Sequence, residues 1–183
     1  MNDVTKVTAG KPKTGGAIFV APVGTTLPTD ATTELDSAFA NLGYISEDGV
    51  TQNITRDSES IKAWGGDTVM TTQTDFAETF AFRMIEALNL NAKKVTFGPE
   101  NVTGTLETGV TVQTNAAELP AQSYVIDMVQ NGYLVRKVIP NAKVTELGEI
   151  QYVDGQAVGY EPTITALPDS AGNTSYEYIS AAA

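Results

Sequence analysis

The alternation of apolar and polar side chains is strongest in residues 68–84. In the second half of this stretch, every other position is large and mostly apolar, in the series Phe76, Glu78, Phe80, Phe82 and Met84. A period of two residues is typical of a β-strand that buries one face. We therefore predict a long strand here that buries its aromatic side chains.

Beyond residue 84 the period of the apolar pattern lengthens to three or four residues. This spacing is typical of an amphipathic helix, and the apolar positions that show it are Ile85, Leu88, Ala92 and Val95. Lysines late in this segment suit the helix dipole, and Gly98 followed by Pro99 is a common helix end. The pattern over residues 68–98 thus predicts a strand that leads directly into one helix.

Turn-forming dipeptides divide much of the remaining chain into short strands. Asn131-Gly132, between alternating segments at 123–130 and 133–139, is the strongest two-residue hairpin signal. Two Asp-Gly pairs predict further hairpins, with strands at 42–46 and 50–56 around Asp48-Gly49, and at 148–153 and 156–166 around Asp154-Gly155. Residues 34–40 are interpreted as one or two helical turns. We expect roughly eight to ten strands in total.

These patterns predict a mainly β protein with one α-helix. Residues 1–15 are rich in Thr, Lys and Gly and show no period, so we expect a flexible N-terminal arm. The rest of the 183-residue chain is long enough for one well-packed domain, which we assign to residues 16–183. The expected architecture is a β-sandwich or partly open barrel with a flanking helix.

The composition offers little catalytic chemistry. The chain has no cysteine and no histidine, which excludes thiolate zinc sites, cysteine nucleophiles and the commonest general base. Its 22 acidic residues do not single out a carboxylate pair for glycoside hydrolysis, and no phosphate-binding loop has the required spacing. We expect no catalytic residue, no metal site and no cofactor. We also expect neither a transmembrane helix nor a secretory signal.

The net charge is −11 and is unevenly distributed. The first thirteen residues contain three lysines, Lys6, Lys11 and Lys13, against Asp3 alone, so the remainder carries −13. A surface with this acidic excess repels nucleic acid phosphates. Two interpretations stay open: the charge keeps the protein soluble, or it keeps the surface from binding DNA.

Two residues in and near the predicted strand raise questions of placement. The only tryptophan, Trp64, lies beside Gly65-Gly66 in the polar segment 57–67. A lone tryptophan is usually part of a core, but a polar segment between strands suits docking against a partner. Glu78 lies among phenylalanines, where an unpaired buried carboxylate is costly. We favour a position for Glu78 at a subunit boundary; the alternative is that Arg83 or another neighbour satisfies it.

The order of several segments resembles a known protein family. These segments are GAIFVAPVGTTLPTDATTELDSAFANLGYISEDGV over residues 16–50, IKAWGGDTV over 61–69, GYLVRKVIPNAKVTELGEI over 132–150, GQAVGYEPTITALPD over 155–169 and YEYI over 176–179. Together they resemble the major tail tube proteins of long-tailed, siphovirus-type phages. The related tubes of contractile tails, tailocins and type VI secretion remain close alternatives.

The resemblance implies a structural virion protein of the phage tail, made in the bacterial host cytoplasm, without enzymatic activity or membrane insertion. Proteins of this family form hexameric rings that stack into a hollow tube, through which DNA passes as non-specific cargo. The implied partners are further copies of the chain and the tape measure, tail terminator, distal tail and tail-assembly chaperone proteins. A carbohydrate-binding β-sandwich is the alternative of a different class, against which one tryptophan and no secretion signal argue.

Within this interpretation we predict two contact regions between subunits. The polar segment 57–67 is expected to pack against a neighbour, with Trp64 as its anchor. The predicted subunit-interface residues are Arg56, Asp57, Lys62, Trp64, Gly65, Gly66, Asp67 and Glu78. The arm is expected to contribute to ring stacking through Lys6, Lys11 and Lys13.

Overall fold

The structure is a computed structural model that describes residues 2–182, so Met1 of the expected arm and Ala183 of the expected domain lie outside the described residues. Within this range it has eleven strands, one more than the upper expectation, and one α-helix. The strands are β1 (Lys11–Pro12), β2 (Ile18–Pro22), β3 (Ala40–Asn41), β4 (Ile45–Lys62), β5 (Thr68–Met84), β6 (Val102–Thr105), β7 (Gly109–Val112), β8 (Gln122–Gln130), β9 (Tyr133–Leu147), β10 (Pro162–Ala166) and β11 (Tyr176–Ala181). The helices are α1 (Leu90–Phe97) and the 3-10 turns η1 (Val4–Lys6) and η2 (Pro99–Asn101).

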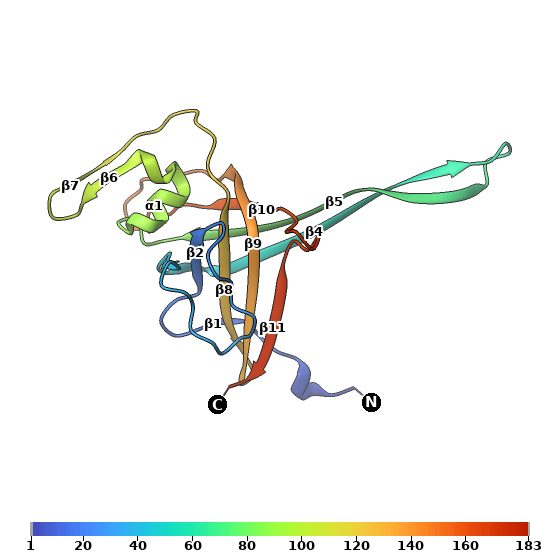
Figure 1. The fold of residues 1–183 in the computed structure, drawn as a ribbon, viewed down its shortest axis with the longest axis horizontal. Coiled ribbons are helices and arrows are strands. Elements are labelled where there is room, and N and C mark those ends of the chain that lie inside the picture. Colours follow the sequence, from blue (N-terminus) through green and yellow to red (C-terminus); the bar gives the residue numbers. More distant parts are fainter. Residues whose placement is uncertain (1, 183) are drawn as a thin grey trace.

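Nine of the strands form one antiparallel sheet, and β6 and β7 form a separate hairpin (Figure 1). The main strand order is β3-β2-β8-β9-β10-β5-β4, with β1 added to β8 and β11 added to β9. The long strand β9 pairs with β11 through its first half and with β10 through its second. The sheet folds over itself without closing into a barrel. The predicted mainly β architecture, a sandwich with one flanking helix, is confirmed.

Two apolar clusters hold the layers together. In the larger one, alternate side chains of β5, such as Phe80 and Phe82, pack with Ile126 of β8, Ile164 of β10 and Val95 of α1. The smaller cluster lies on the opposite face of β8 and β9, where the segment 23–39 and β11 cover Val125 and Val138. Because β8 and β9 are covered on both faces, they form the centre of the fold.

The strand predicted over 68–84 is confirmed as β5, and the period-two face from Glu78 to Met84 is buried. The helix is shorter than predicted, because it begins at Leu90 instead of residue 85. The Asn89 side chain accepts hydrogen bonds from the backbone N–H groups of Asn91 and Ala92 at 2.9 and 3.4 Å. This N-cap fixes the start of the helix, and Leu88 lies exposed before it.

The hairpin predicted around Asp48-Gly49 is wrong. Ile45 pairs with Met84 and Val50 pairs with Phe82, so residues 46–49 form a bulge within one continuous strand, β4. The left-handed backbone of Gly49, with φ of 69°, serves this bulge. The true turn comes near Gly65-Gly66. Of the polar segment 57–67, residues 57–62 belong to β4, which pairs with β5 with register shifts after Asp57 and after Ile61.

Two other local predictions also differ from the structure. Asp154-Gly155 makes a turn, but residues 148–153 form no strand and β10 begins only at Pro162. Residues 34–40 form no helix. The Ala38 N–H donates to the Asp36 carboxylate and the Phe39 N–H donates to the Asp36 carbonyl, both at 2.9 Å, which makes one isolated turn. Leu35 and Phe39 pack into the smaller apolar cluster from this irregular segment.

The hairpin predicted at 123–130 and 133–139 is confirmed as β8 and β9, although β9 continues past residue 139 to Leu147. Its two-residue turn places both Asn131, with φ of 47°, and Gly132, with φ of 81°, in the left-handed region. Asn-Gly pairs adopt this turn at low cost, and its twist matches that of the flanking strands. The turn therefore fixes the register in which Gln130 faces Tyr133 and Asp127 faces Arg136.

The N-terminal segment is tied to the sheet at its end. Lys11 and Pro12 pair with Val129 and Met128 of β8, and the Lys13 backbone N–H donates to the carbonyl of Asp127 at 3.2 Å. Residues 2–10 are exposed. The flexibility expected for the arm as a whole stays a prediction.

Candidate assembly interface

The β4–β5 hairpin extends far beyond the rest of the molecule (Figure 1). Strand β5 pairs with β10 only from Glu78 to Ala81, and farther out β4 and β5 pair only with each other among the described residues. Every residue from 51 to 75 is exposed. This part of the hairpin therefore has two free strand edges and two uncovered faces, which is a ready template for pairing with another chain.

Trp64 lies at the tip of this hairpin. The tip is closed by hydrogen bonds from the Ala63 N–H to the Asp67 carbonyl at 2.8 Å and from the Gly66 N–H to the Ala63 carbonyl at 3.0 Å. Gly65 and Gly66 have φ of 118° and 103°, which only glycine adopts readily. The relative exposure of Trp64 is 107%, so the core alternative for this residue is wrong.

Three further apolar side chains that the sequence interpretation missed lie close to the tip. Ile61 and Met70 are cross-strand partners, Val69 follows Thr68 at the start of β5, and all three are exposed. Ile61 was missed because it lies in the segment 57–67, which was interpreted as polar and irregular, and Val69 and Met70 were missed because they precede the alternating part of the strand predicted over 68–84. With Trp64 they make an apolar tip, which we define as Ile61, Trp64, Val69 and Met70.

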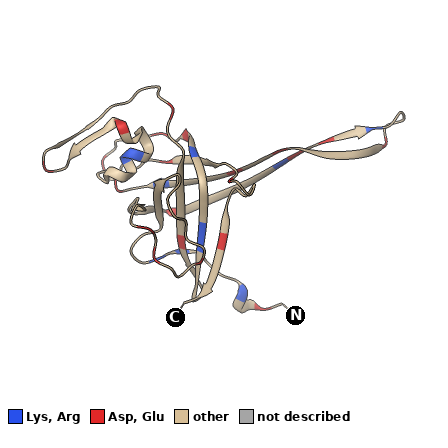
Figure 2. Ribbon diagram, in the orientation of Figure 1, with Lys and Arg blue, Asp and Glu red and all other residues tan. Residues whose placement is uncertain are grey.

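Charged side chains of both signs are interspersed along the hairpin (Figure 2). The Arg56 guanidinium lies 4.6 Å from the centre of the Phe76 ring and donates to the Gln73 side chain at 3.2 Å. Asp57 lies directly opposite Asp75 in the register. Like charges in that position repel each other. A cation from another molecule, placed next to both carboxylates, would reduce this repulsion.

Glu78 is buried within the subunit, with a relative exposure of 2%, so its expected position beyond the edge of the core is wrong. Its carboxylate accepts hydrogen bonds from Gln52 at 2.6 Å, from Ser175 at 2.9 Å and from the Thr174 hydroxyl. These donors satisfy the carboxylate without an external partner. Arg83 is not among them, because it donates to the carbonyl of Ala157.

Arg136 and Asp127 form a buried ion pair that the sequence interpretation did not find. Arg136 Nε and Nη2 donate to the two carboxylate oxygens of Asp127 at 2.6 and 2.8 Å. Arg136 Nη1 donates to the carbonyls of Asp30 and Thr33 at 3.1 and 2.7 Å. The guanidinium thus attaches the segment 23–39 to the central strands.

The turn that Arg136 grips is organised by the Asp30 carboxylate. The Thr33 hydroxyl, the Thr33 N–H and the Thr32 N–H donate to it at 2.5, 2.6 and 2.7 Å. These hydrogen bonds, led by that of the Thr33 hydroxyl, hold the pKa of Asp30 well below its usual range. The turn therefore keeps its anionic form under mildly acidic conditions.

The described residues offer no group of three or more acidic side chains that could hold a metal ion. Within residues 2–182, no helix has the length and apolar character needed to cross a lipid bilayer. What these residues do display is an uncovered β-hairpin with an apolar tip, an arrangement suited to binding another protein chain.

A comparison with protein families decides the class of protein. The sequence model of the family described as phage tail tube protein matches residues 1–183. The chain belongs to the phage tail tube protein family. No curated protein sequence matches this tail tube protein.

Membership of the family makes this chain a structural component of the virion tail, and it implies self-association and assembly with other tail proteins. The predicted phage tail tube family is therefore confirmed, whereas the siphovirus type of the tail stays a prediction. Of the residues predicted for the subunit interface, the hairpin brings together Arg56, Asp57, Lys62, Trp64, Gly65, Gly66 and Asp67, whereas Glu78 lies inside the subunit. Lys6 lies in η1, Lys11 lies in β1 and Lys13 follows it directly. Strand β1 lies far from the tip of the β4–β5 hairpin (Figure 1).

Proposed function

We propose that this tail tube protein forms hexameric rings, which stack into the hollow tube of a siphovirus-type tail. The β4–β5 hairpin is the observation that carries the proposal. An isolated two-stranded hairpin is only marginally stable in water, yet this one extends beyond the body with every residue from 51 to 75 exposed. Contact with a neighbouring subunit supplies the missing cover and explains both the free edges and the apolar tip.

The proposed subunit interface is the outer part of the hairpin. It comprises Arg56, Asp57, Lys62, Trp64, Gly65, Gly66 and Asp67, together with the apolar tip. Trp64 acts as the anchor, because large aromatic side chains that become fully desolvated dominate protein interfaces. We omit Glu78 from this interface, since its carboxylate is enclosed and satisfied within one subunit.

The acidic excess supports a role for the tube as a passage for DNA. At −11 per subunit, every ring is strongly negative. Phosphates are repelled by such a surface, so DNA passes without binding. The tape measure, tail terminator, distal tail and tail-assembly chaperone proteins are the proposed partners, and the basic residues Lys6, Lys11 and Lys13 are proposed to stack against an acidic neighbouring ring.

Electron microscopy tests this proposal directly. The purified protein is expected to be monomeric when dilute and to form tubes with a central channel when concentrated. The Trp64→Ala variant should form tubes poorly while its unfolding free energy remains within about 0.5 kcal/mol of the wild type, because the side chain is exposed in the monomer.

Tyr152→Ala is the matched control for the loss of an exposed aromatic side chain, because Tyr152 lies outside the hairpin. It is expected to form tubes normally. A protein that stays monomeric at high concentration, even with phage assembly factors present, would contradict the proposal. Unfolding of the Trp64→Ala monomer would instead contradict the anchor role.

A further inference from the structure

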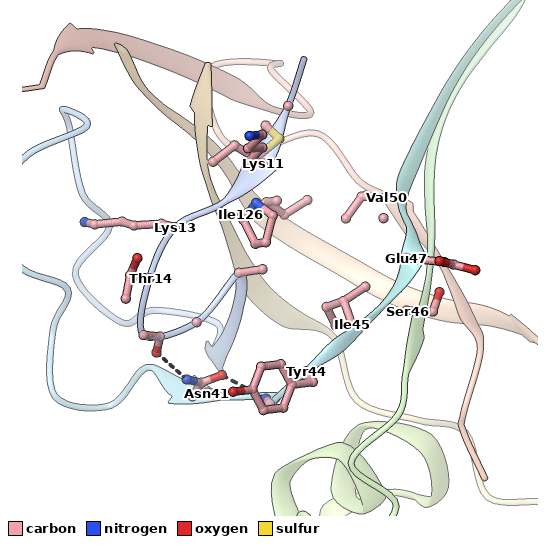
Figure 3. Close-up of a pocket in the computed structure, with 18 of the residues that line it drawn as sticks. Lys11, Lys13, Thr14, Asn41, Tyr44, Ile45, Ser46, Glu47, Val50 and Ile126 are labelled. Atoms are coloured by element: carbon pink, nitrogen blue, oxygen red, sulfur yellow. Dashed lines mark hydrogen bonds between the residues drawn. The ribbon is translucent and has the colours of Figure 1, made fainter. Parts of the chain in front are cut away.

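A groove separates the N-terminal segment from the beginning of β4. It has a volume of about 910 Å³ and runs between residues 10–17 on one side and residues 43–50 on the other. Figure 3 shows Ile45, Val50 and Ile126 directed toward the space between these two walls. The β4 wall contains the bulge at 46–49, which is not paired with β5. The β4 wall is therefore an irregular edge of the sheet, and the opposite wall is the N-terminal segment that pairs with β8 through β1.

The groove has an apolar floor and an exposed aromatic residue at one end. Ile45, Val50 and Met128 are partly buried and pack against the main core. The end near Asn41 is braced by hydrogen bonds of 2.8 Å, from the Asn41 side chain to the Gly15 carbonyl and from the Gly43 N–H to Asn41 Oδ1 (Figure 3). Tyr44 lies at this end with a relative exposure of 76%.

The hairpin tip matches the groove in size and chemistry. Pockets of 300–1,000 Å³ enclose ligands of drug size, so a groove of about 910 Å³ has room for an indole and its flanking turn. The tip is apolar around Trp64, with Lys62 on its β4 side and Asp67 on its β5 side. The two walls of the groove carry the complementary charges, with Asp48 on the β4 side and Lys11 on the arm side. Figure 3 shows the neighbouring Glu47 directed away from the groove.

The placement of the two features also determines the kind of assembly they can make. The groove lies at the start of β4 and the apolar tip at its end, so about 55 Å of extended strand separates them. A contact between the tip of one copy and the groove of another therefore joins unlike surfaces. Such heterologous contacts propagate around a ring or along a filament.

We propose that the hairpin tip of one subunit, residues 61–70, docks into the groove between residues 10–17 and 43–50 of the next copy of this chain. Trp64 packs against Tyr44 and the apolar floor, Lys62 lies near the acidic bulge, and Asp67 lies near Lys11. The inference rests on the proposed self-assembly and names the surface that receives the hairpin.

Cross-linking of single-cysteine variants tests the contact, because the natural chain has no cysteine. Ala63→Cys marks the tip and Thr14→Cys marks the arm wall of the groove. The two purified variants are mixed at assembly concentration and treated with a short bismaleimide reagent. We expect a covalent dimer that forms at least about tenfold more than with either variant alone, since each variant offers only one side of a heterologous contact.

The control pair combines Ala63→Cys with Ser170→Cys, which lies exposed in a turn outside the groove. Equal cross-linking in the control and test pairs would overturn the inference. A third mixture, Thr8→Cys with Thr14→Cys, tests the neighbour's N-terminal arm as the occupant. If this mixture cross-links more than the tip pair, the arm fills the groove and the inference is wrong.

Imaging the same samples separates this inference from the proposed function. Tubes without the tip-to-groove cross-link overturn the inference and leave tube formation standing. Cross-linked chains without tubes support the contact and contradict the tube. Absence of both products overturns both.

The contact between Trp64 and Tyr44 is tested separately with variants of two of the exposed tyrosines, Tyr44 and Tyr152. Tyr44→Ala should raise the concentration needed for assembly by at least about tenfold, as expected for an interface hot spot. Tyr152, which has the same relative exposure of 76% and does not line the groove, provides the control variant Tyr152→Ala. Equal effects of the two substitutions would contradict the docking of Trp64 on Tyr44.

Discussion

Arg136 is a buried polar side chain at the centre of this tail tube protein. Its relative exposure is 1%, and it donates four hydrogen bonds, two to the carboxylate of Asp127 and two to backbone carbonyls of the segment 23–39. A buried ion pair adds little compared with an apolar pair of the same size, but removing one partner leaves an uncompensated charge. Replacing Arg136 is therefore expected to lower the free energy of unfolding, because the Asp127 carboxylate would stay buried without its cation.

The Arg136→Met variant should lose about 3–5 kcal/mol of unfolding free energy, because Asp127 then remains buried without its main cation. Urea unfolding followed by circular dichroism measures the change. The double variant Arg136→Met/Asp127→Leu should recover part of the loss, since no buried charge remains. A loss below about 1 kcal/mol in the single variant would contradict this account.

Lys137→Met is the matched control, at the next position of β9. Lys137 pairs with Glu177 at 3.0 Å; the Lys137 side chain is 13% exposed, whereas that of Glu177 is 45% exposed and stays in contact with water. Because the carboxylate that loses its partner remains hydrated, we expect a loss of only about 1 kcal/mol or less. The contrast between the two variants isolates the effect of leaving a buried carboxylate without its cation.

At the scale of elements, the N-terminal arm can be separated from the body. Deleting residues 1–15 removes the two paired residues of β1 and the 3.6 Å contact between Lys13 and Asp127, while the apolar core stays intact. We expect the shortened chain to fold and to form shorter or fewer stacked tubes, because it loses the three lysines and also most of the arm wall of the proposed groove, residues 10–15. Unfolding measurements and tube lengths in electron micrographs give the two readouts.

A shorter deletion, of residues 1–9, serves as the control for this prediction. It retains β1 together with Lys11 and Lys13 and removes only Lys6 among the basic residues of the arm. If stacking depends on the basic residues, the tubes of this variant should be intermediate in length between those of the full chain and those of the chain that lacks residues 1–15. If both deletions assemble as well as the full chain, the arm has no part in stacking.

The elements that the sequence could predict are those specified by local patterns. The alternation from Phe76 to Met84 predicts β5 because one face of that strand is buried against the core. The Asn131-Gly132 turn predicts not only a hairpin but its register, and counting outward from it pairs Asp127 with Arg136. The buried ion pair could therefore have been found from the sequence.

The bulge in β4 could not be found in the same way. Asp48-Gly49 carries the local signal of a turn, and only the pairing of residues on both sides with β5 shows that the strand continues. The exposed outer hairpin has no buried face, so its residues carry no alternating pattern. Likewise, no local signal at Glu78 indicates that Thr174 and Ser175, nearly a hundred residues away, supply its hydrogen bonds.

At the scale of the whole molecule, the chain combines a covered sandwich with an uncovered hairpin (Figure 1). The sandwich buries its apolar clusters within one subunit, whereas the apolar tip of the hairpin is exposed and available for contacts with other subunits. Assembly must therefore bring together subunits that each carry a net charge of −11. Apolar contact favours association and the long-range repulsion between the subunits opposes it.

This balance predicts that salt promotes tube formation. Raising the ionic strength from 0.01 to 0.15 M shortens the Debye length from about 30 to about 8 Å, which screens repulsion between whole subunits more than contacts at the interface. The concentration at which tubes appear, measured by sedimentation and micrographs, should fall several-fold. Sucrose at matched osmolality is the control and should leave it nearly unchanged. If salt instead dissolves the tubes, exposed ion pairs dominate the interface and the apolar tip is not its main source of stability.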